Sequence, residues 1–323
     1  MKVTEKIKNS DKPLFSIEIL PPKKGENIEN LFQTVETLLQ FDPAFINVTY
    51  HREEYVYREV KNGLLEKHTV RKRPGTVGIC AAIKNKFNIE PVPHIICGGF
   101  SKEETENALI DLNFLGVNNI MALRGDPIKS EGRFKADQNG HAFASELIEQ
   151  IKNLNNGEYL DPSLKNSSPS NFCIGVAGYP EKHFESPNLQ TDLKYLKNKV
   201  DLGAEYIITQ LFYDNDSYHR FVDSCRKAGI KVPIIPGLKP ITAKSQMNII
   251  PHFFHVNLPE ELCSKIEKCT SPEEVKKIGV DWSIKQTENL VSQGVPAIHF
   301  YTMGKADSVR QIANHIFSPA ISS

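Results

Sequence analysis

Residues 189–212 read LQTDLKYLKNKVDLGAEYIITQLF and contain a helix pattern followed by a strand pattern. Apolar residues recur at helical spacing between Leu189 and Gly203, which is typical of a helix with one buried face. Gly203 suits the left-handed backbone that ends many helices. The segment Tyr206–Phe212 is short, apolar and rich in isoleucine, as expected for a strand buried on both faces of a parallel sheet. This stretch predicts one helix–strand unit of an α/β protein.

The same alternation of apolar strands and amphipathic helices extends along the chain in both directions. The eight predicted strands are Phe15–Leu20, Phe45–Tyr50, Val92–Cys97, Asn119–Arg124, Cys173–Tyr179, Tyr206–Phe212, Val232–Gly237 and Ala297–Met303. The predicted helices include Ile28–Gln40, Ser101–Gly116, Leu189–Gly203, Ser217–Gly229, Ser271–Gly294 and Ser308–Phe317. Eight such units favour a (β/α)8 TIM barrel, whereas a doubly wound sheet usually has fewer strands. We therefore expect residues 1–323 to form a single (β/α)8 barrel domain.

Three segments interrupt this alternation. Arg71–Pro91 and His252–Thr270 are interpreted as insertions, the first with a short extra strand at Val77–Ile83. The Asn-, Ser- and Pro-rich stretch Asp161–Asn171 is expected to be a polar loop before the fifth strand.

The composition excludes several classes of protein. Lys and Arg number 39, as do Asp and Glu, so no overall charge attracts nucleic acid. No stretch approaches the roughly 20 apolar residues that span a bilayer, so no membrane partner is expected. The polar start MKVTEKIKNSDKP lacks the apolar run of a secretory signal, which indicates a cytoplasmic protein. The six cysteines include no Cys-x-x-Cys pair and are interpreted as reduced thiols, with no metal site.

Polar residues gather at the carboxyl ends of the predicted strands, where barrel enzymes place their active sites. On the first strand, period-two alternation turns Phe15, Ile17 and Ile19 toward the helices. The same alternation turns Glu18 into the barrel. A buried carboxylate is unfavourable unless it is paired or protonated, and barrel interiors are normally apolar. We therefore favour a functional role for Glu18 over a structural ion pair.

Other motifs are less informative. The chain has no G-x-x-x-x-G-K-[ST] phosphate loop and no G-x-G-x-x-G fingerprint. Lys239, after the seventh strand, could form a Schiff base, but a contact with a phosphate or a helix cap is an equal alternative. His252 and His255 could share a helical face, but they lack an obvious carboxylate partner, so a metal site is not expected there.

Several stretches, in this order, resemble the methylenetetrahydrofolate reductase family. They are FSIEILPPK at 15–23, INVTYHR at 46–52, VPHIIC at 92–97, IMALRGDP at 120–127, GVAGYPEKH at 175–183, TDLKYLKNKVDLGAEYIITQLFYD at 191–214, IIPGLKPI at 234–241 and IHFYTMGK at 298–305. They cover almost the whole chain, and their combination is much more specific than any one of them. The resemblance implies a (β/α)8 barrel that binds FAD without a covalent bond, which agrees with the independent strand count.

The resemblance also assigns roles to individual residues. Glu18 matches the general acid of the family and Asp126 the aspartate beside the flavin. Gln210 matches the glutamine that binds the pterin, and Gln246 and Lys305 fall at folate contacts. The implied flavin contacts are Thr49, Tyr50, Arg52, His94, Arg124, Gly125, Asp126, Phe143, Ala144, Tyr179, His183, Asp192, Asn198 and Lys199. Among them Arg124, His183 and Lys199 can supply positive charge for the pyrophosphate.

The implied reaction is the FAD-dependent reduction of 5,10-methylenetetrahydrofolate to 5-methyltetrahydrofolate, which supplies methyl groups for methionine synthesis. NADH or NADPH reduces the flavin and leaves before folate binds, a ping-pong sequence. Protonated Glu18 then donates to N10, the ring opens to a 5-iminium cation, and that carbon receives the hydride. Asp126, with Arg124 as its neighbour, is expected to remain a carboxylate that stabilises the cation. The choice between NADH and NADPH is left open by the sequence.

The resemblance carries three further expectations. Relatives of the bacterial type form homo-oligomers, so a homo-oligomer is expected. The chain stops soon after the eighth helix, so we expect no C-terminal regulatory domain. Some relatives pack a Phe against nicotinamide or folate at a position where this chain has Ile250, with Phe253 and Phe254 nearby.

Two other functions compete with a folate reductase. One is a flavin-dependent barrel that oxidises a cyclic amine such as proline, which the combination of Glu18, Asp126 and Gln210 disfavours. The other is a non-catalytic, folate-binding barrel, which has no need for an acid such as Glu18.

Overall fold

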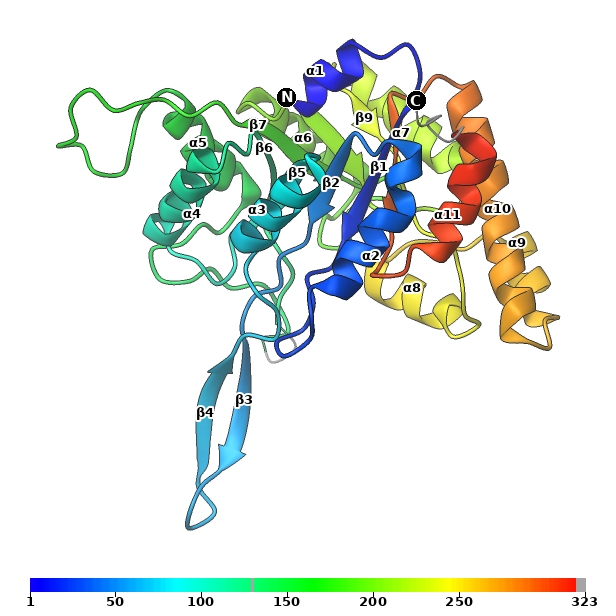
Figure 1. The fold of residues 1–323 in the computed structure, drawn as a ribbon, viewed down its shortest axis with the longest axis horizontal. Coiled ribbons are helices and arrows are strands. Elements are labelled where there is room, and N and C mark those ends of the chain that lie inside the picture. Colours follow the sequence, from blue (N-terminus) through cyan, green and yellow to red (C-terminus); the bar gives the residue numbers. More distant parts are fainter. Residues whose placement is uncertain (129–130, 318–323) are drawn as a thin grey trace.

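The computed structural model describes residues 1–128 and 131–317 as a barrel of parallel strands surrounded by helices (Figure 1). Within this part of the chain the sheet has nine strands, hydrogen-bonded in the order β10-β11-β1-β2-β5-β6-β7-β8-β9. Their bounds are β1 Leu14–Ile19, β2 Phe45–Val48, β5 Glu90–Ile96, β6 Asn119–Leu123, β7 Cys173–Gly178, β8 Tyr206–Thr209, β9 Ile234–Ile235, β10 Gly237–Leu238 and β11 Ala297–Tyr301. The TIM-barrel fold class predicted from the sequence is confirmed.

The barrel closes through a single short segment of chain. The two edge strands, β9 and β10, are consecutive in the sequence and are separated only by Pro236. Proline has no backbone N–H, so it interrupts a strand at this point. Its carbonyl still accepts a hydrogen bond of 3.0 Å from the backbone N–H of His299 in β11. The predicted seventh strand is therefore two short strands, of which β9 pairs with β8 and β10 pairs with β11.

Helices follow the strands and cover the outside of the barrel (Figure 1). They are α2 Glu29–Leu38 with the short 3-10 helix η1 Leu39–Phe41, α3 Thr76–Phe87, α4 Lys102–Phe114, α5 Ala144–Asn155, α6 Leu189–Asp201, α7 Asn215–Lys227, α8 Gln246–Phe254, α9 Glu260–Glu267, α10 Pro272–Ser292 and α11 Asp307–Ile316. The start of α4 shows the predicted capping box, in which Ser101 accepts from Glu104 N–H and Glu104 accepts from Ser101 N–H. None of the helices in the described part of the chain is long and apolar enough to cross a membrane.

The two faces of the strands pack against different partners. Phe15, Ile17 and Ile19 point outward into the core between sheet and helices, as predicted. A second apolar cluster fills the inside of the barrel and includes Tyr206 and Val3. Val3 belongs to the helix α1 (Val3–Lys8), and its backbone N–H donates to Asn119 Oδ1 over 2.8 Å. Helix α1 thus covers the amino-terminal end of the barrel, which leaves the carboxyl end for a site.

The predicted strand at Val77–Ile83 is wrong, because this segment lies in helix α3. Its β-branched residues suggested a strand, but Ile79, Cys80 and Ile83 are buried at helical spacing on one face. Helix α3 is a regular barrel helix, so most of Arg71–Pro91 is not an insertion. The segment His252–Thr270 contains the end of α8 and all of α9.

A β-hairpin was not predicted at all. Strands β3 (Glu54–Glu59) and β4 (Leu65–Val70) pair antiparallel and project away from the barrel (Figure 1). Asn62 and Gly63, in the connecting loop, both have positive φ. The predicted loop Asp161–Asn171 contains no helix or strand, in agreement with its polar composition.

Candidate active site

Two adjoining cavities open at the carboxyl ends of the strands. The larger, here called the central cavity, has a volume of about 950 Å³ and reaches down to Glu18 and His94. The smaller, the side cavity, has a volume of about 690 Å³ and extends toward α8, α10 and α11. The residues that line both are Asp126, Tyr179, His183, Gln210, Lys239, Phe254, Tyr301 and Met303. The two cavities therefore adjoin along these shared residues.

Glu18 lies near the floor of the central cavity, on strand β1. The register places it opposite Asn47 of β2 and Tyr301 of β11, and its side chain is 13% exposed. Glu18 Oε2 lies 3.4 Å from Nε2 of His94 on β5. Burial raises the pKa of the Glu18 carboxyl to about 8. Glu18 is therefore mostly protonated at neutral pH, as required of an acid.

His94 is held as a neutral ring beside this carboxyl. Burial is the main cause that lowers the pKa of His94 to about 3, and the nearby His51 lowers it further. Asn47 Nδ2 lies 3.2 Å from His94 Nε2. Which of the two groups donates depends on the tautomer of His94 and on the orientation of the Asn47 amide, whose Oδ1 has no hydrogen-bond partner among the described residues. Burial therefore accounts for both the protonated form of Glu18 and the neutral form of His94.

Asp126 lies in the turn after β6 and lines both cavities. Gly125 precedes it with φ of +84°, and a Cβ there would lie 3.2 Å from the Ile96 side chain. Glycine thus permits the tight turn that presents Asp126 to the cavity. Arg124, which was expected to support Asp126, forms an ion pair of 2.6 Å between its Nη1 and Glu185, from the loop after β7.

Two other cations of the central cavity, Arg52 and Lys199, also have protein partners. Arg52 forms ion pairs with Glu131 at 3.0 Å and Asp137 at 3.6 Å, and its side chain is 8% exposed. Lys199 donates to the Ala177 carbonyl over 2.8 Å, and burial lowers its pKa to about 8. A bound anion at this cavity would therefore compete with existing contacts.

All of the predicted flavin contacts line the central cavity. They are Thr49, Tyr50, Arg52, His94, Arg124, Gly125, Asp126, Phe143, Ala144, Tyr179, His183, Asp192, Asn198 and Lys199. They come from strand β5, from loops after several strands, from the start of α5 and from α6, in which Asp192 lies in the first turn and Asn198 and Lys199 lie near the carboxyl end. Asp192 fixes one of these loops, since it accepts from His183 N–H at 3.1 Å and from Ser186 Oγ at 2.7 Å.

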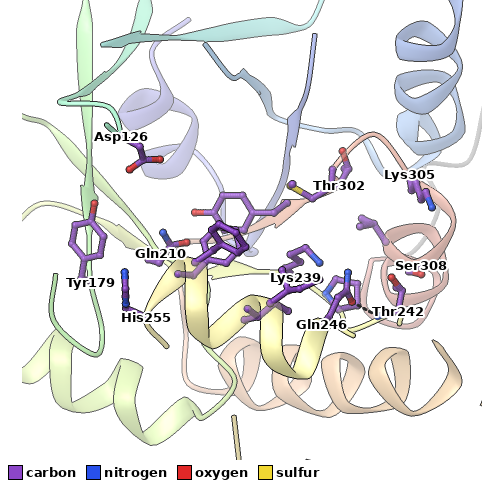
Figure 2. A pocket seen from close by; sticks show the side chains of 18 of the residues that line it. Asp126, Tyr179, Gln210, Lys239, Thr242, Gln246, His255, Thr302, Lys305 and Ser308 are labelled. Carbon is purple, nitrogen blue, oxygen red and sulfur yellow. Dashed lines mark hydrogen bonds between the residues drawn. The ribbon is translucent and has the colours of Figure 1, made fainter. Parts of the chain in front are cut away.

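The predicted folate residues lie along the side cavity. In Figure 2, Asp126 and Tyr179 lie at one end, Lys305 lies at the other, and Gln210 and Lys239 lie between them. Gln210 Oε1 accepts from Leu211 N–H over 2.9 Å, which leaves its amide NH2 available to a ligand. Gln246 is held in the same way, because its Oε1 accepts from Thr242 N–H at 2.7 Å.

The structure distinguishes Ile250, Phe253 and Phe254, the candidates for packing against nicotinamide or folate, by where their side chains lie. Ile250 is only 1% exposed and packs in a separate apolar cluster with Leu211 and Tyr213. Phe253 is 62% exposed at the side cavity, whereas Phe254 lines both cavities. Of these three residues, Phe254 is thus the one that lies where the two cavities meet.

Three contributors to the site had no role assigned from the sequence. Asn47 and Tyr301 lie at strand ends, and period-two alternation from Thr49 and His299 would have placed them inside the barrel. Nothing in the sequence indicated a role for Glu185, because its ion pair with Arg124 joins two loops that are distant in sequence.

Comparison with known proteins agrees with this geometry. The family model described as methylenetetrahydrofolate reductase matches residues 2–316. The chain belongs to the methylenetetrahydrofolate reductase family. The 5,10-methylenetetrahydrofolate reductase of Escherichia coli is 30% identical over 293 residues, which cover 90% of this chain and 86% of that protein. Members of the family are oxidoreductases, named as NADH or NADPH forms.

Longer relatives match over part of their length. Methylenetetrahydrofolate reductase (NADH) 1 of Arabidopsis thaliana is 32% identical over 316 residues, covering 94% of this chain and 48% of that protein. The chain therefore spans about half the length of the plant and yeast reductases. Among solved structures, an uncharacterised protein from Clostridium thermocellum that binds two copies of 5-methyl-5,6,7,8-tetrahydrofolic acid has a TM-score of 0.56 at 14% identity and covers 97% of both chains. That similarity supports the fold alone.

Proposed function

We propose that this chain reduces 5,10-methylenetetrahydrofolate to 5-methyltetrahydrofolate, with non-covalent FAD and with NADH or NADPH as the hydride donor. The observation that carries the proposal is the protonated Glu18 at the floor of a cavity also lined by Asp126 and Gln210. Membership of the reductase family supports the same activity.

The central cavity fits FAD in both size and chemistry. It is continuous, has a volume of about 950 Å³, and carries Arg52, Arg124, His183 and Lys199 along its wall. Arg124 and Lys199 are suited to the pyrophosphate, while His94, Asp126 and Tyr179 line the part nearest Glu18. Bound FAD would supply the two-electron relay between the nicotinamide and the folate.

Glu18 would act as the general acid of the folate reaction. At neutral pH its carboxyl holds a proton, because burial raises the pKa to about 8. That proton would pass to N10 of the folate and open the five-membered ring to a 5-iminium cation. Burial beside the neutral His94 ring would keep the carboxyl protonated until the substrate arrives.

Asp126 and Gln210 would act on the pterin part of the substrate. The Asp126 carboxylate would stabilise the positive charge of the iminium cation by electrostatic attraction. The free amide NH2 of Gln210 would donate to the pterin edge, since its oxygen is already bound by Leu211 N–H. The two carboxyl groups would thus have different roles, Glu18 as the acid and Asp126 as the group that stabilises the cation.

In the cell, the product would supply methyl groups for methionine synthesis. We place this activity in the cytoplasm and expect the enzyme to be a homo-oligomer, with residues 1–323 as one catalytic barrel.

The visible absorption spectrum of the purified protein tests the proposal. A flavin band should bleach on anaerobic addition of NADH or NADPH and return on addition of methylenetetrahydrofolate. Return of the band with a cyclic imine, and not with the folate, would favour a barrel that acts on cyclic amines such as proline. A protein that is colourless and takes up no added FAD would overturn the flavoenzyme assignment.

A further inference from the structure

Lys239 is a cation inside the site for which the family resemblance gives no role. It directly follows β10 and lines both the central and the side cavity. Within residues 1–128 and 131–317, no ion pair or side-chain hydrogen bond of its ammonium group is found. Burial lowers the pKa of Lys239 to about 8.

The strand geometry explains why this side chain enters the mouth of the barrel. A Cβ at Gly237 would lie 2.7 Å from the Tyr301 ring, so the side-chain direction at Gly237 is toward the barrel interior. Side chains two residues apart on a strand share a face, which directs Lys239 the same way. Tyr301 pairs in register with Glu18. The stem of Lys239 therefore starts close to the level of the proposed acid.

Other lysines of the side cavity differ, because their charge is already used by the protein. Lys276 forms an ion pair with Asp307. Lys182 donates to the carbonyls of His183 at 2.9 Å and Ser186 at 2.6 Å. Lys239 and Lys305 are the lysines of this cavity for which the described residues provide no such partner.

A half-buried ammonium group without a counter-charge loses hydration, and no ion pair or hydrogen bond compensates for that loss. Such a group is favourable where a ligand brings the missing anion. In Figure 2, Lys305 lies at the end of the cavity away from Asp126 and Lys239 lies between them, so these two lysines follow Asp126 along the length of the cavity.

On the basis of the function proposed above, we propose that Lys239 binds a carboxylate of the glutamyl tail of the folate, with Lys305 beside it. The pterin and the p-aminobenzoyl group are neutral at pH 7, and the tail carries the negative charges of this substrate. A pterin held near Asp126 and Gln210 would direct its tail toward the opposite, positive end. Lys239 would then be a specificity residue that selects folates over tail-less pteroates.

The test compares two substrates that differ only in the glutamyl tail, 5,10-methylenetetrahydrofolate and 5,10-methylenetetrahydropteroate. Lys239→Met should lower kcat/KM for the folate about tenfold, mainly through KM, because a charge-assisted contact is lost. The pteroate should change less than about twofold. Lys239→Arg, which retains the charge, should restore most of the preference for the folate.

Lys244→Met is the matched control. Lys244 lies in the same loop before α8, donates to the carbonyl of Glu267 over 2.7 Å and does not line either cavity. The Lys244→Met variant removes the same charge from the same region and should leave the ratio of kcat/KM for the folate to that for the pteroate unchanged. Circular dichroism melting of each variant confirms that it is folded.

Three results would overturn this assignment. An equal loss with both substrates would place Lys239 at the pterin or the reacting centre. A slower reduction of the flavin by NADH or NADPH, with folate kinetics unchanged, would assign Lys239 to a dinucleotide phosphate. An unchanged folate-to-pteroate ratio in Lys239→Met would show that the tail is not bound there. If the wild-type protein reduces neither substrate, the proposed function itself fails.

Discussion

Glu18 Oε2 and His94 Nε2 lie 3.4 Å apart inside the barrel, and both side chains are neutral at pH 7. An acidic and a basic side chain at this distance would ordinarily form a charged pair. Burial disfavours both charged forms here and leaves the proton on Glu18. The contact between Glu18 and His94 has the geometry of a salt bridge, but it joins a protonated carboxyl to a neutral ring.

The folate half-reaction should slow as the pH rises through about 8. The pKa of Glu18 is raised to about 8 in the folded protein, so the acid is present below this pH and is lost above it. Stopped-flow reoxidation of the NADH-reduced enzyme by methylenetetrahydrofolate, measured from pH 6 to pH 10, checks this. A rate that stays constant across this range would contradict an acid with this pKa.

Asn47→Ala should lower the pH at which the folate half-reaction is lost. Asn47 pairs in register with Glu18 and lines the same cavity, so its truncation opens space for water beside the carboxyl. Hydration reduces the burial that raises the pKa of Glu18, so the pKa falls and the rate at pH 7 drops about three- to tenfold. If the rate drops with no change in the pH profile, Asn47 has only a packing role.

Glu185→Gln should tighten the binding of FAD to the apoprotein by about three- to tenfold. Glu185 forms a 2.6 Å ion pair with Arg124, and this pairing competes with a phosphate for the guanidinium. Flavin fluorescence quenching gives the dissociation constant. Glu36→Gln, which breaks the 2.9 Å pair with Lys86 outside both cavities, is the control and should have no effect. Weaker binding in Glu185→Gln would mean that Glu185 orients Arg124 for the phosphate.

Gln210→Ala should reduce kcat/KM for methylenetetrahydrofolate by about 10- to 100-fold. Its oxygen is bound to Leu211 N–H, so the loss falls on the amide NH2 that faces the ligand. Reduction of the flavin by NADH or NADPH should change far less, because the nicotinamide lacks the pterin edge. Equal losses in both half-reactions would rule out a specific pterin contact.

The barrel could be predicted because its strands are buried on both faces and leave continuous apolar runs in the sequence. Alternation along β1 was enough to turn Glu18 inward. Helix α3 was missed because Val77, Ile79 and Ile83 are β-branched, and tertiary packing outweighs that preference. The β3–β4 hairpin is mostly exposed and has no apolar pattern, although Asn62-Gly63 is a strong turn signal.

The site was predicted less completely than the fold. The family resemblance located the residues that line the two cavities, and barrel closure brings them together. Their partners could not be predicted, because pairs such as Arg124–Glu185 and Arg52–Glu131 join loops whose approach depends on the three-dimensional structure. Those partners determine which charges are free for a ligand.

The central claim, that Glu18 donates the proton to the folate, is tested most directly by Glu18→Gln. Its flavin should be reduced by NADH or NADPH at a rate within about twofold of the wild type, because that step needs no acid. Reoxidation by methylenetetrahydrofolate should slow by about 100-fold or more, since glutamine has no acidic proton to give. Glu90→Gln, a similarly buried carboxyl at the opposite end of the barrel, serves as the control. Reoxidation of Glu18→Gln at the wild-type rate would contradict the account and remove Glu18 from the mechanism.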